Sequence, residues 1–204
     1  IKESCFEYFS ICNSFRLRTS FVILPPTKNQ YMKTVKIIIT FLIILTVLFF
    51  GTGLVIKDSS YTSQITIHKP LEETFTMFTD VAAMTQWNPA YSSIEIIDQK
   101  PGITGSRYDI KVLNNKQTII IKEKVLAYVK NEKITLFIDR DGVIERDDYT
   151  FTRDGSHTVI NLNSSYQAKS YILSCVLPYF KSKFKKIDEV SLTNFKTFAE
   201  KTIT

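Results

Sequence analysis

The stretch Ile65-Thr-Ile-His-Lys-Pro-Leu-Glu-Glu-Thr-Phe75 contains a change of hydrophobic period that decides the fold. Ile65 and Ile67 alternate with polar residues, which is the pattern of a strand with one buried face. Pro70 then fits the first turn of a helix, where its missing N–H would have no partner. The two acids that follow stand where the positive end of a helix dipole stabilises negative charge. The sequence therefore predicts a strand followed directly by a helix.

A second short helix and a series of strands follow. Asp80 is expected to cap a helix that runs through Met84 and ends near Trp87. Turn signals such as Asp141-Gly142 and Asp154-Gly155 then separate alternating runs, as in antiparallel hairpins. The six strands predicted here are Ser93–Gln99, Arg107–Leu113, Gln117–Val129, Ile134–Asp139, Val143–Thr152 and Thr158–Ala168.

The C-terminal part returns to helical periodicity. Pro178 divides it into a short helix, Ser170–Val176, and a longer one that ends at Lys201. The apolar stripe expected on the longer helix consists of Ile187, Val190, Phe195 and Phe198. The predicted fold is α+β, with a curved antiparallel sheet of seven strands wrapped around a long C-terminal helix.

The segment Ile37–Ile56 has no charged residue, and as a helix it would span roughly 30 Å, the thickness of a bilayer's hydrocarbon core. Secretory signal peptides have shorter apolar regions and a small-x-small cleavage site, so we favour an anchor, with a cleaved signal as the alternative. Lys33 and Lys36 outnumber Lys57 at the flanks, which predicts that the following domain faces the extracytoplasmic side.

The predicted organisation has three parts. Residues 1–31 precede the first Met, Met32, and are interpreted as an upstream extension of the reading frame or as a short cytoplasmic tail. Residues 32–57 form the transmembrane anchor or an uncleaved signal, and residues 58–204 form one globular domain. Of the three cysteines only Cys175 belongs to that domain, so it contains no partner for an internal disulfide.

The charge distribution argues against a nucleic-acid partner. Residues 1–57 contain 7 Lys and Arg against 2 acids, whereas residues 58–204 contain 19 against 18. A nucleic-acid-binding domain would have its basic excess on its own surface. The one basic cluster, Lys181–Lys186, is interpreted as a solvated helix face, with anionic headgroups as an alternative partner. We expect a monomer.

Several of these motifs resemble a known family. The run Ile65–Phe75, Asp80 and Trp87-Asn-Pro89 are similar to the opening of the SRPBCC superfamily, the START-related and birch-pollen-allergen-like helix-grip proteins. Gly102-Ile-Thr-Gly105 and Leu192–Glu200 resemble its later signatures, and the nearest likeness is to membrane-anchored, polyketide cyclase/dehydrase-like members. The resemblance covers about residues 61–201 and implies a cavity between the sheet and the terminal helix, open to apolar ligands.

Strand alternation indicates which side chains would line that cavity. If Tyr149 and Phe151 point inward, Glu145 and Asp147 lie on the same face. The alternative is that a bulge or strand end leaves both acids in water. The predicted ligand-binding residues are Tyr108, Ile110, Glu145, Asp147, Tyr149, Phe151, Leu162, Tyr166 and Phe195. Trp87 is interpreted as a packing residue.

No catalytic motif, cofactor fingerprint or metal-ligand spacing is found in the sequence. We therefore expect no cofactor, no metal and no catalytic residue. Three functions remain open. The first is a membrane-anchored domain that binds a lipid or another apolar small molecule. The second is a cyclase- or dehydratase-like enzyme that uses Glu145, Asp147 and cavity tyrosines. The third is a protein-interaction module.

Overall fold

The computed structural model describes residues 28–56, 58–114 and 117–201. The chain divides into two units, residues 1–44 and 45–204, and each is described by itself. Most of the segment predicted to be an extension or a cytoplasmic tail, residues 1–27, lies outside the described residues.

The first described element is the helix α1, Lys28–Val55. Among the described residues it is the one helix long and apolar enough to cross a membrane, over Tyr31–Val55. Apolar side chains all along this helix are exposed, as expected for a helix whose surroundings are themselves apolar. Both a membrane span and a signal sequence have these properties.

The sheet has seven strands, all paired antiparallel, in the order β1-β7-β6-β5-β4-β3-β2. The predicted seven-stranded antiparallel sheet is confirmed, although the first strand starts earlier than its alternation indicated, at Asp58. The strands are β1 Asp58–Ile67, β2 Tyr91–Asp98, β3 Arg107–Asn114, β4 Gln117–Val129, β5 Lys133–Arg140, β6 Val143–Asp154 and β7 His157–Ala168.

The helices also follow the predicted order. They are α2 Leu71–Thr79, α3 Met84–Trp87, α4 Tyr171–Val176, the 3-10 helix η1 Leu177–Phe180 and α5 Lys181–Lys201. Asp80 does not cap a continuous helix, because a turn over residues 81–83 precedes α3. Its Oδ1 instead accepts a hydrogen bond from the Ala82 amide at 2.9 Å and closes that turn.

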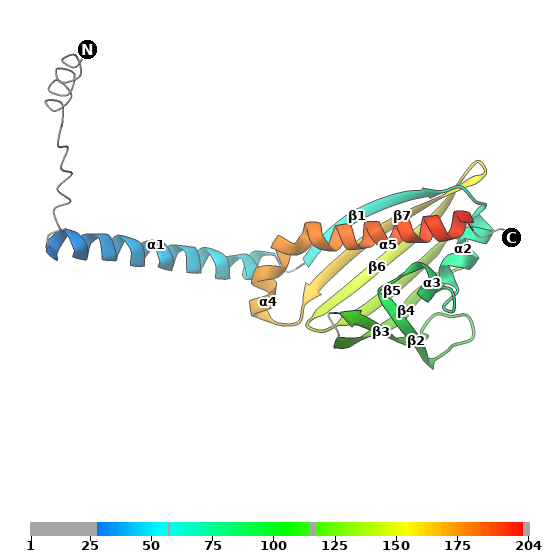
Figure 1. The fold of residues 1–204 in the computed structure, drawn as a ribbon, viewed down its shortest axis with the longest axis horizontal. Coiled ribbons are helices and arrows are strands. Elements are labelled where there is room, and N and C mark those ends of the chain that lie inside the picture. The colour runs from blue at the N-terminus through cyan, green and yellow to red at the C-terminus, as the bar shows by residue number, and fades with distance from the viewer. Residues whose placement is uncertain (1–27, 57, 115–116, 202–204) are drawn as a thin grey trace, which may run out of the picture. The chain divides into compact units, whose positions relative to one another are not determined.

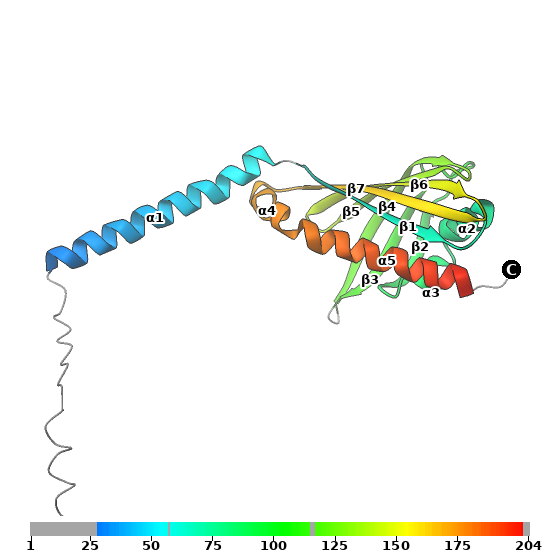
Figure 2. The same cartoon turned by 90° about the horizontal axis from the view of Figure 1, so that it is seen from above.

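The helix α5 lies along one face of the sheet, and α2 and α3 lie near its C-terminal end (Figures 1 and 2). Phe195 of α5 is fully buried and meets the rings of Phe78 and Trp87 edge to face, with centroids 5.0 and 5.3 Å away. Aromatic pairs favour this edge-to-face geometry. The core therefore joins the terminal helix to α2, α3 and the sheet, which is the arrangement of a helix-grip fold.

The buried stripe of α5 differs from the predicted one. Its buried residues are Asp188, Leu192, Phe195 and Ala199, which recur at intervals of three and four. Ile187 and Val190 are instead about half exposed, at 48% and 51%. They border a cavity rather than packed side chains, so helical periodicity alone did not separate core positions from cavity positions.

Truncation of Phe195 tests this packing. We expect Phe195→Ala to lower the free energy of unfolding by about 3–5 kcal/mol, because it leaves a void beside the rings of Phe78 and Trp87. Val190→Ala, on the same helix, should cost less than about 1 kcal/mol because that side chain is half exposed. Urea unfolding of the full chain in a mild nonionic detergent, followed by circular dichroism, measures both. Equal, small losses would show that α5 is not held by this cluster.

Candidate ligand-binding site

A cavity of about 510 Å³ lies between the sheet and α5. This volume is within the range typical of small-molecule sites. Side chains of α2, α3, strands β2 to β6 and α5 line it. Its apolar lining consists of Phe78, Met84, Trp87, Val112, Ile121, Leu136, Ile138, Ile187 and Val190.

Polar side chains also line the cavity, and the strand register explains how they meet. Within the sheet, Glu123 of β4 is opposite Ile138 of β5, and Ile138 is opposite Glu145 of β6. Asp147 is two residues beyond Glu145, so both point to the same face. The polar residues of the lining include Tyr91, Glu123, Arg140, Asp147, Tyr149 and Asp188.

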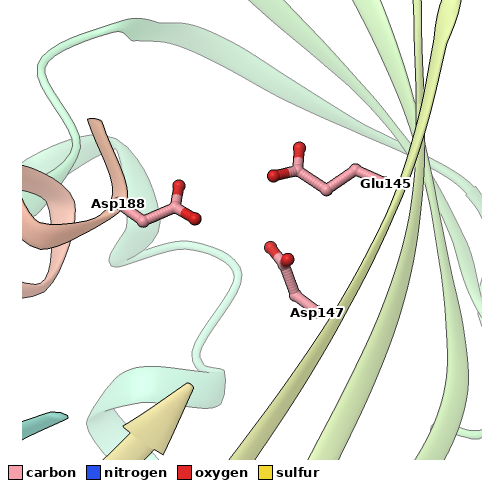
Figure 3. A group of neighbouring side chains, drawn as sticks. All are labelled: Glu145, Asp147 and Asp188. Carbon is pink, nitrogen blue, oxygen red and sulfur yellow. The ribbon is translucent and has the colours of Figure 1, made fainter. Parts of the chain in front are cut away.

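Three carboxyl groups converge beside the cavity (Figure 3). Glu145 and Asp147 come from β6 and Asp188 from α5, with one oxygen of each within 4.8 Å of the others. All three side chains are buried, at 2%, 2% and 8% exposure. The alternative in which a bulge or strand end leaves Glu145 and Asp147 in water does not occur.

Two neighbours stabilise part of this carboxyl cluster. Arg140 of β5 places its Nη2 2.8 Å from a Glu145 oxygen, a charge-assisted contact. The Tyr61 hydroxyl of β1 donates to Asp188. Asp147 is less well satisfied. The Tyr149 hydroxyl lies 3.5 Å from its Oδ2 and the Ser164 hydroxyl also stabilises its charged form, but its Oδ1 has no hydrogen-bond partner among the described residues.

Burial shifts the acid equilibria of the cluster. It raises the pKa of Asp147 well above the ordinary range, and the nearby charges of Glu145 and Asp188 raise it further. Burial also raises the pKa of Glu145 and of Asp188, although Arg140 opposes both shifts. Burial therefore favours the protonated forms of these three carboxyl groups more than water would.

The convergence of carboxylate oxygens also raises the question of a metal. Such oxygens are the ligands that Ca²⁺ and Mg²⁺ prefer. Here, however, a guanidinium already contributes positive charge at Glu145, and a hydroxyl donates to Asp188. This donor set fits a hydrogen-bonded carboxyl cluster better than a cation cage, and the expectation of no metal stays a prediction.

Sequence reasoning missed Glu123, which lies in the same cavity. The side chain is 5% exposed, and it has no hydrogen-bond or ion-pair partner among the described residues. Burial raises its pKa to about 7, even though Arg140 acts in the opposite direction. The signal was present in the alternation of Ile121, Glu123 and Val125, where an acid occupies an inward position. Asp188 was missed for a similar reason, since it precedes Leu192 by four residues on the buried stripe.

The structure brings only some of the nine predicted residues to the cavity surface. Asp147 and Tyr149 line it, and Glu145 lies behind Arg140, which also lines it. Tyr166 belongs to a separate cluster with Tyr61 and Leu177. The others pack in the main core: Tyr108, Ile110, Phe151, Leu162 and Phe195. Trp87 both packs on Phe78, with ring centroids 5.7 Å apart, and lines the cavity.

The raised pKa of Glu123 predicts a pH-dependent stability. The folded state keeps a proton up to pH of about 7, whereas the unfolded state loses it near the ordinary pKa of 4.5. The free energy of unfolding should therefore fall by about 2–3 kcal/mol as the pH rises from 5 to 8. Glu123→Gln should remove that part of the fall and be more stable than the wild type at pH 8.

Urea unfolding of the full chain at the two pH values measures this effect. Glu95→Gln is the matched control, because Glu95 is 62% exposed and pairs only with Lys111 at 3.9 Å. The control should follow the wild type at both pH values. A Glu123→Gln variant with the wild-type pH profile would show that this carboxyl is hydrated in the folded protein.

Comparison with solved structures supports the fold. The chain is similar to Ara h 8.0201, with 12% identity, a TM-score of 0.58 and coverage of 71% of this chain and 99% of that one. It is also similar to the Zhui aromatase/cyclase of Streptomyces sp. R1128, with 11% identity, a TM-score of 0.60 and coverage of 70% and 94%. A START superfamily protein from Mycobacterium smegmatis matches with 14% identity, a TM-score of 0.55 and coverage of 65% and 93%.

These matches confirm the expected resemblance to START-related and birch-pollen-allergen-like proteins at the level of the fold. No protein-family model and no protein of curated function matches the sequence. In total, 311 solved chains match in the structural comparison. Because one fold serves many functions, the function has to be argued from the site itself.

Proposed function

We propose that the domain binds an apolar small molecule or lipid in the cavity between the sheet and α5. The observation that carries this proposal is the cavity of about 510 Å³ with its mainly hydrophobic and aromatic lining. Ile187 and Val190 of α5 support it, because both are large apolar side chains, both are about half exposed, and both border the cavity. A ligand would remove this apolar surface from water.

We further propose that α1 anchors the domain to a membrane, with the domain on the extracytoplasmic side. The length and apolar surface of α1 fit a span, and the basic residues before it fit this orientation. An anchored domain of this kind would meet its ligand at or near the bilayer, where apolar molecules concentrate.

A second candidate function is acid–base catalysis of a cyclase or dehydratase type. The observation that favours it is the group of buried carboxyls beside the cavity, whose raised pKa values favour the protonated form that a general acid needs. The two functions differ in the fate of the ligand, which leaves unchanged in the first and altered in the second.

Filling the cavity tests the binding function. Val190→Trp adds a bulky ring to a half-exposed position on the cavity lining and should abolish copurification of a ligand. Thr193→Trp, an exposed position of α5 outside the lining, is the matched control and should keep the ligand. Native mass spectrometry of the full chain, purified from its own host, reports the bound mass.

The same measurement separates the candidate functions. A ligand that keeps both its mass and its fragmentation pattern during incubation supports binding alone. Loss of the mass of one water supports dehydration, and an unchanged mass with a new fragmentation pattern supports cyclisation. If the wild type carries no bound mass and no lipid raises its melting temperature, the binding proposal is wrong.

The orientation is tested by proteolysis. Protease added to spheroplasts should digest residues after Asp58 while the segment before Lys36 stays protected, because only the former would lie outside. Digestion that requires lysis would reverse the orientation. Recovery of the domain in the soluble extracytoplasmic fraction would instead show that the apolar segment is cleaved.

A further inference from the structure

We propose that the ligand of this cavity is a cationic amphiphile, with an apolar body and a protonated amine directed at Glu123 and Asp147. This inference rests on the proposed binding function and specifies the chemical class of the ligand. Three features of the described residues carry it: the balance of charge around the cavity, two carboxyl groups without adequate partners, and the aromatic rings beside them.

With Glu145 included, acidic groups outnumber basic ones around the polar part of the cavity, and a bound cation would favour their charged forms, which burial disfavours. The acids that line the cavity are Glu123, Asp147 and Asp188. Glu145 does not line the cavity but contacts Arg140, which does. Arg140 is the one basic side chain of the sheet that lines the cavity, and it is committed to Glu145 at 2.8 Å. The other two basic lining residues, Lys183 and Lys186, are on α5 and exposed to solvent.

Two carboxyl groups without adequate partners indicate where in the cavity the charged head group of the ligand would lie. Glu123 is 95% buried, lines the cavity and has no hydrogen-bond or ion-pair partner among the described residues. The Oδ1 of Asp147 is buried and equally without a partner. A buried oxygen left unsatisfied, such as Asp147 Oδ1, costs about 1–3 kcal/mol, so a ligand that donates a hydrogen bond to it would recover that cost. A protonated amine supplies three donors and a compensating charge.

Three other classes of head group fit less well. A carboxylate or phosphate placed at this end would meet four acids and one guanidinium, whose Nη2 is paired with Glu145 and whose buried Nε has no hydrogen-bond partner among the described residues. A head group without donors would bury Glu123 and Asp147 with their oxygens still unsatisfied. A neutral hydroxyl could satisfy one oxygen but would leave the excess of negative charge.

The aromatic residues of the cavity suit a cation as well. Trp87, Tyr91 and Tyr149 all line it. The faces of such rings attract cations, and the attraction is stronger away from bulk water. The charges of Glu123 and Asp147 raise the pKa of Tyr91 after the larger effect of its burial, so these three lining residues belong to one polar region of the cavity.

Matched probes test the inference. Octylamine, octanol and octanoate share one apolar chain and differ in the head group. Each is titrated by calorimetry into the full chain in phosphatidylcholine nanodiscs, and titration into empty nanodiscs corrects for partitioning. At pH 8 octylamine should bind about tenfold tighter than octanol, which corresponds to about 1.4 kcal/mol, and octanoate should bind weakest.

Two conservative variants locate the amine. Glu123→Gln and Asp147→Asn should each weaken octylamine about tenfold and change octanol less than about twofold, because only the charged contact is lost. Glu95→Gln, remote from the cavity lining, should leave all three affinities unchanged. Lowering the pH from 8 to 5.5 should weaken octylamine in the wild type, because Glu123 takes up a proton near pH 7.

The outcomes distinguish this inference from the proposed function. If octanol or octanoate binds as tightly as octylamine, the cavity binds apolar molecules but the cationic head group is wrong. The inference is also overturned if both variants bind octylamine like the wild type. If none of the three probes binds, the proposed binding function fails and the inference fails with it.

Discussion

The structure depends on a mismatch of widths between the sheet and the helix that covers it. Seven strands about 4.8 Å apart make a face roughly 29 Å wide, whereas one helix with its side chains is about 10–12 Å across. The helix α5 lies against β1 at one edge of the sheet, and α2 and α3 cover part of the rest. These helices cover the inward side chains of the middle strands only in part, and the cavity lies between those strands and α5.

This mismatch also explains why polar residues can occupy inward positions. Tightly packed strands such as β7 place Ile160 and Leu162 inward, fully buried against the core. Over the cavity, the equivalent positions of β4 and β6 carry Glu123, Glu145 and Asp147. A carboxyl group there retains space for a partner that is not part of the chain. Arg140 compensates for one of these acids and leaves the others to be satisfied by protonation or by a ligand.

Much of the fold was predictable because it is encoded locally. The alternation around Ile65, the turn at Asp141-Gly142 and the helical period after Pro178 each predicted the observed element. The site was less predictable because its members meet across the fold. Alternation along β6 placed Glu145 and Asp147 on one face, but Asp188 comes from a helix and Arg140 from the neighbouring strand. Helical periodicity predicted Ile187 and Val190 as core residues, because nothing in the local sequence distinguishes a position that packs against side chains from one that borders a cavity.

The buried acids are not needed for the stability of the core, which is an argument that they serve binding. An apolar residue in place of Glu123 would pack against Ile121 and Ile138 without any cost of desolvation, so the core gives no reason for an acid at this position. The same argument applies to Asp147, which forms no ion pair of its own in this structure. Positions where a sequence departs from the local requirements of packing are most often those that serve a function. The two acids lie on one wall of one cavity, so they are explained together by a single ligand that carries positive charge into an otherwise apolar site.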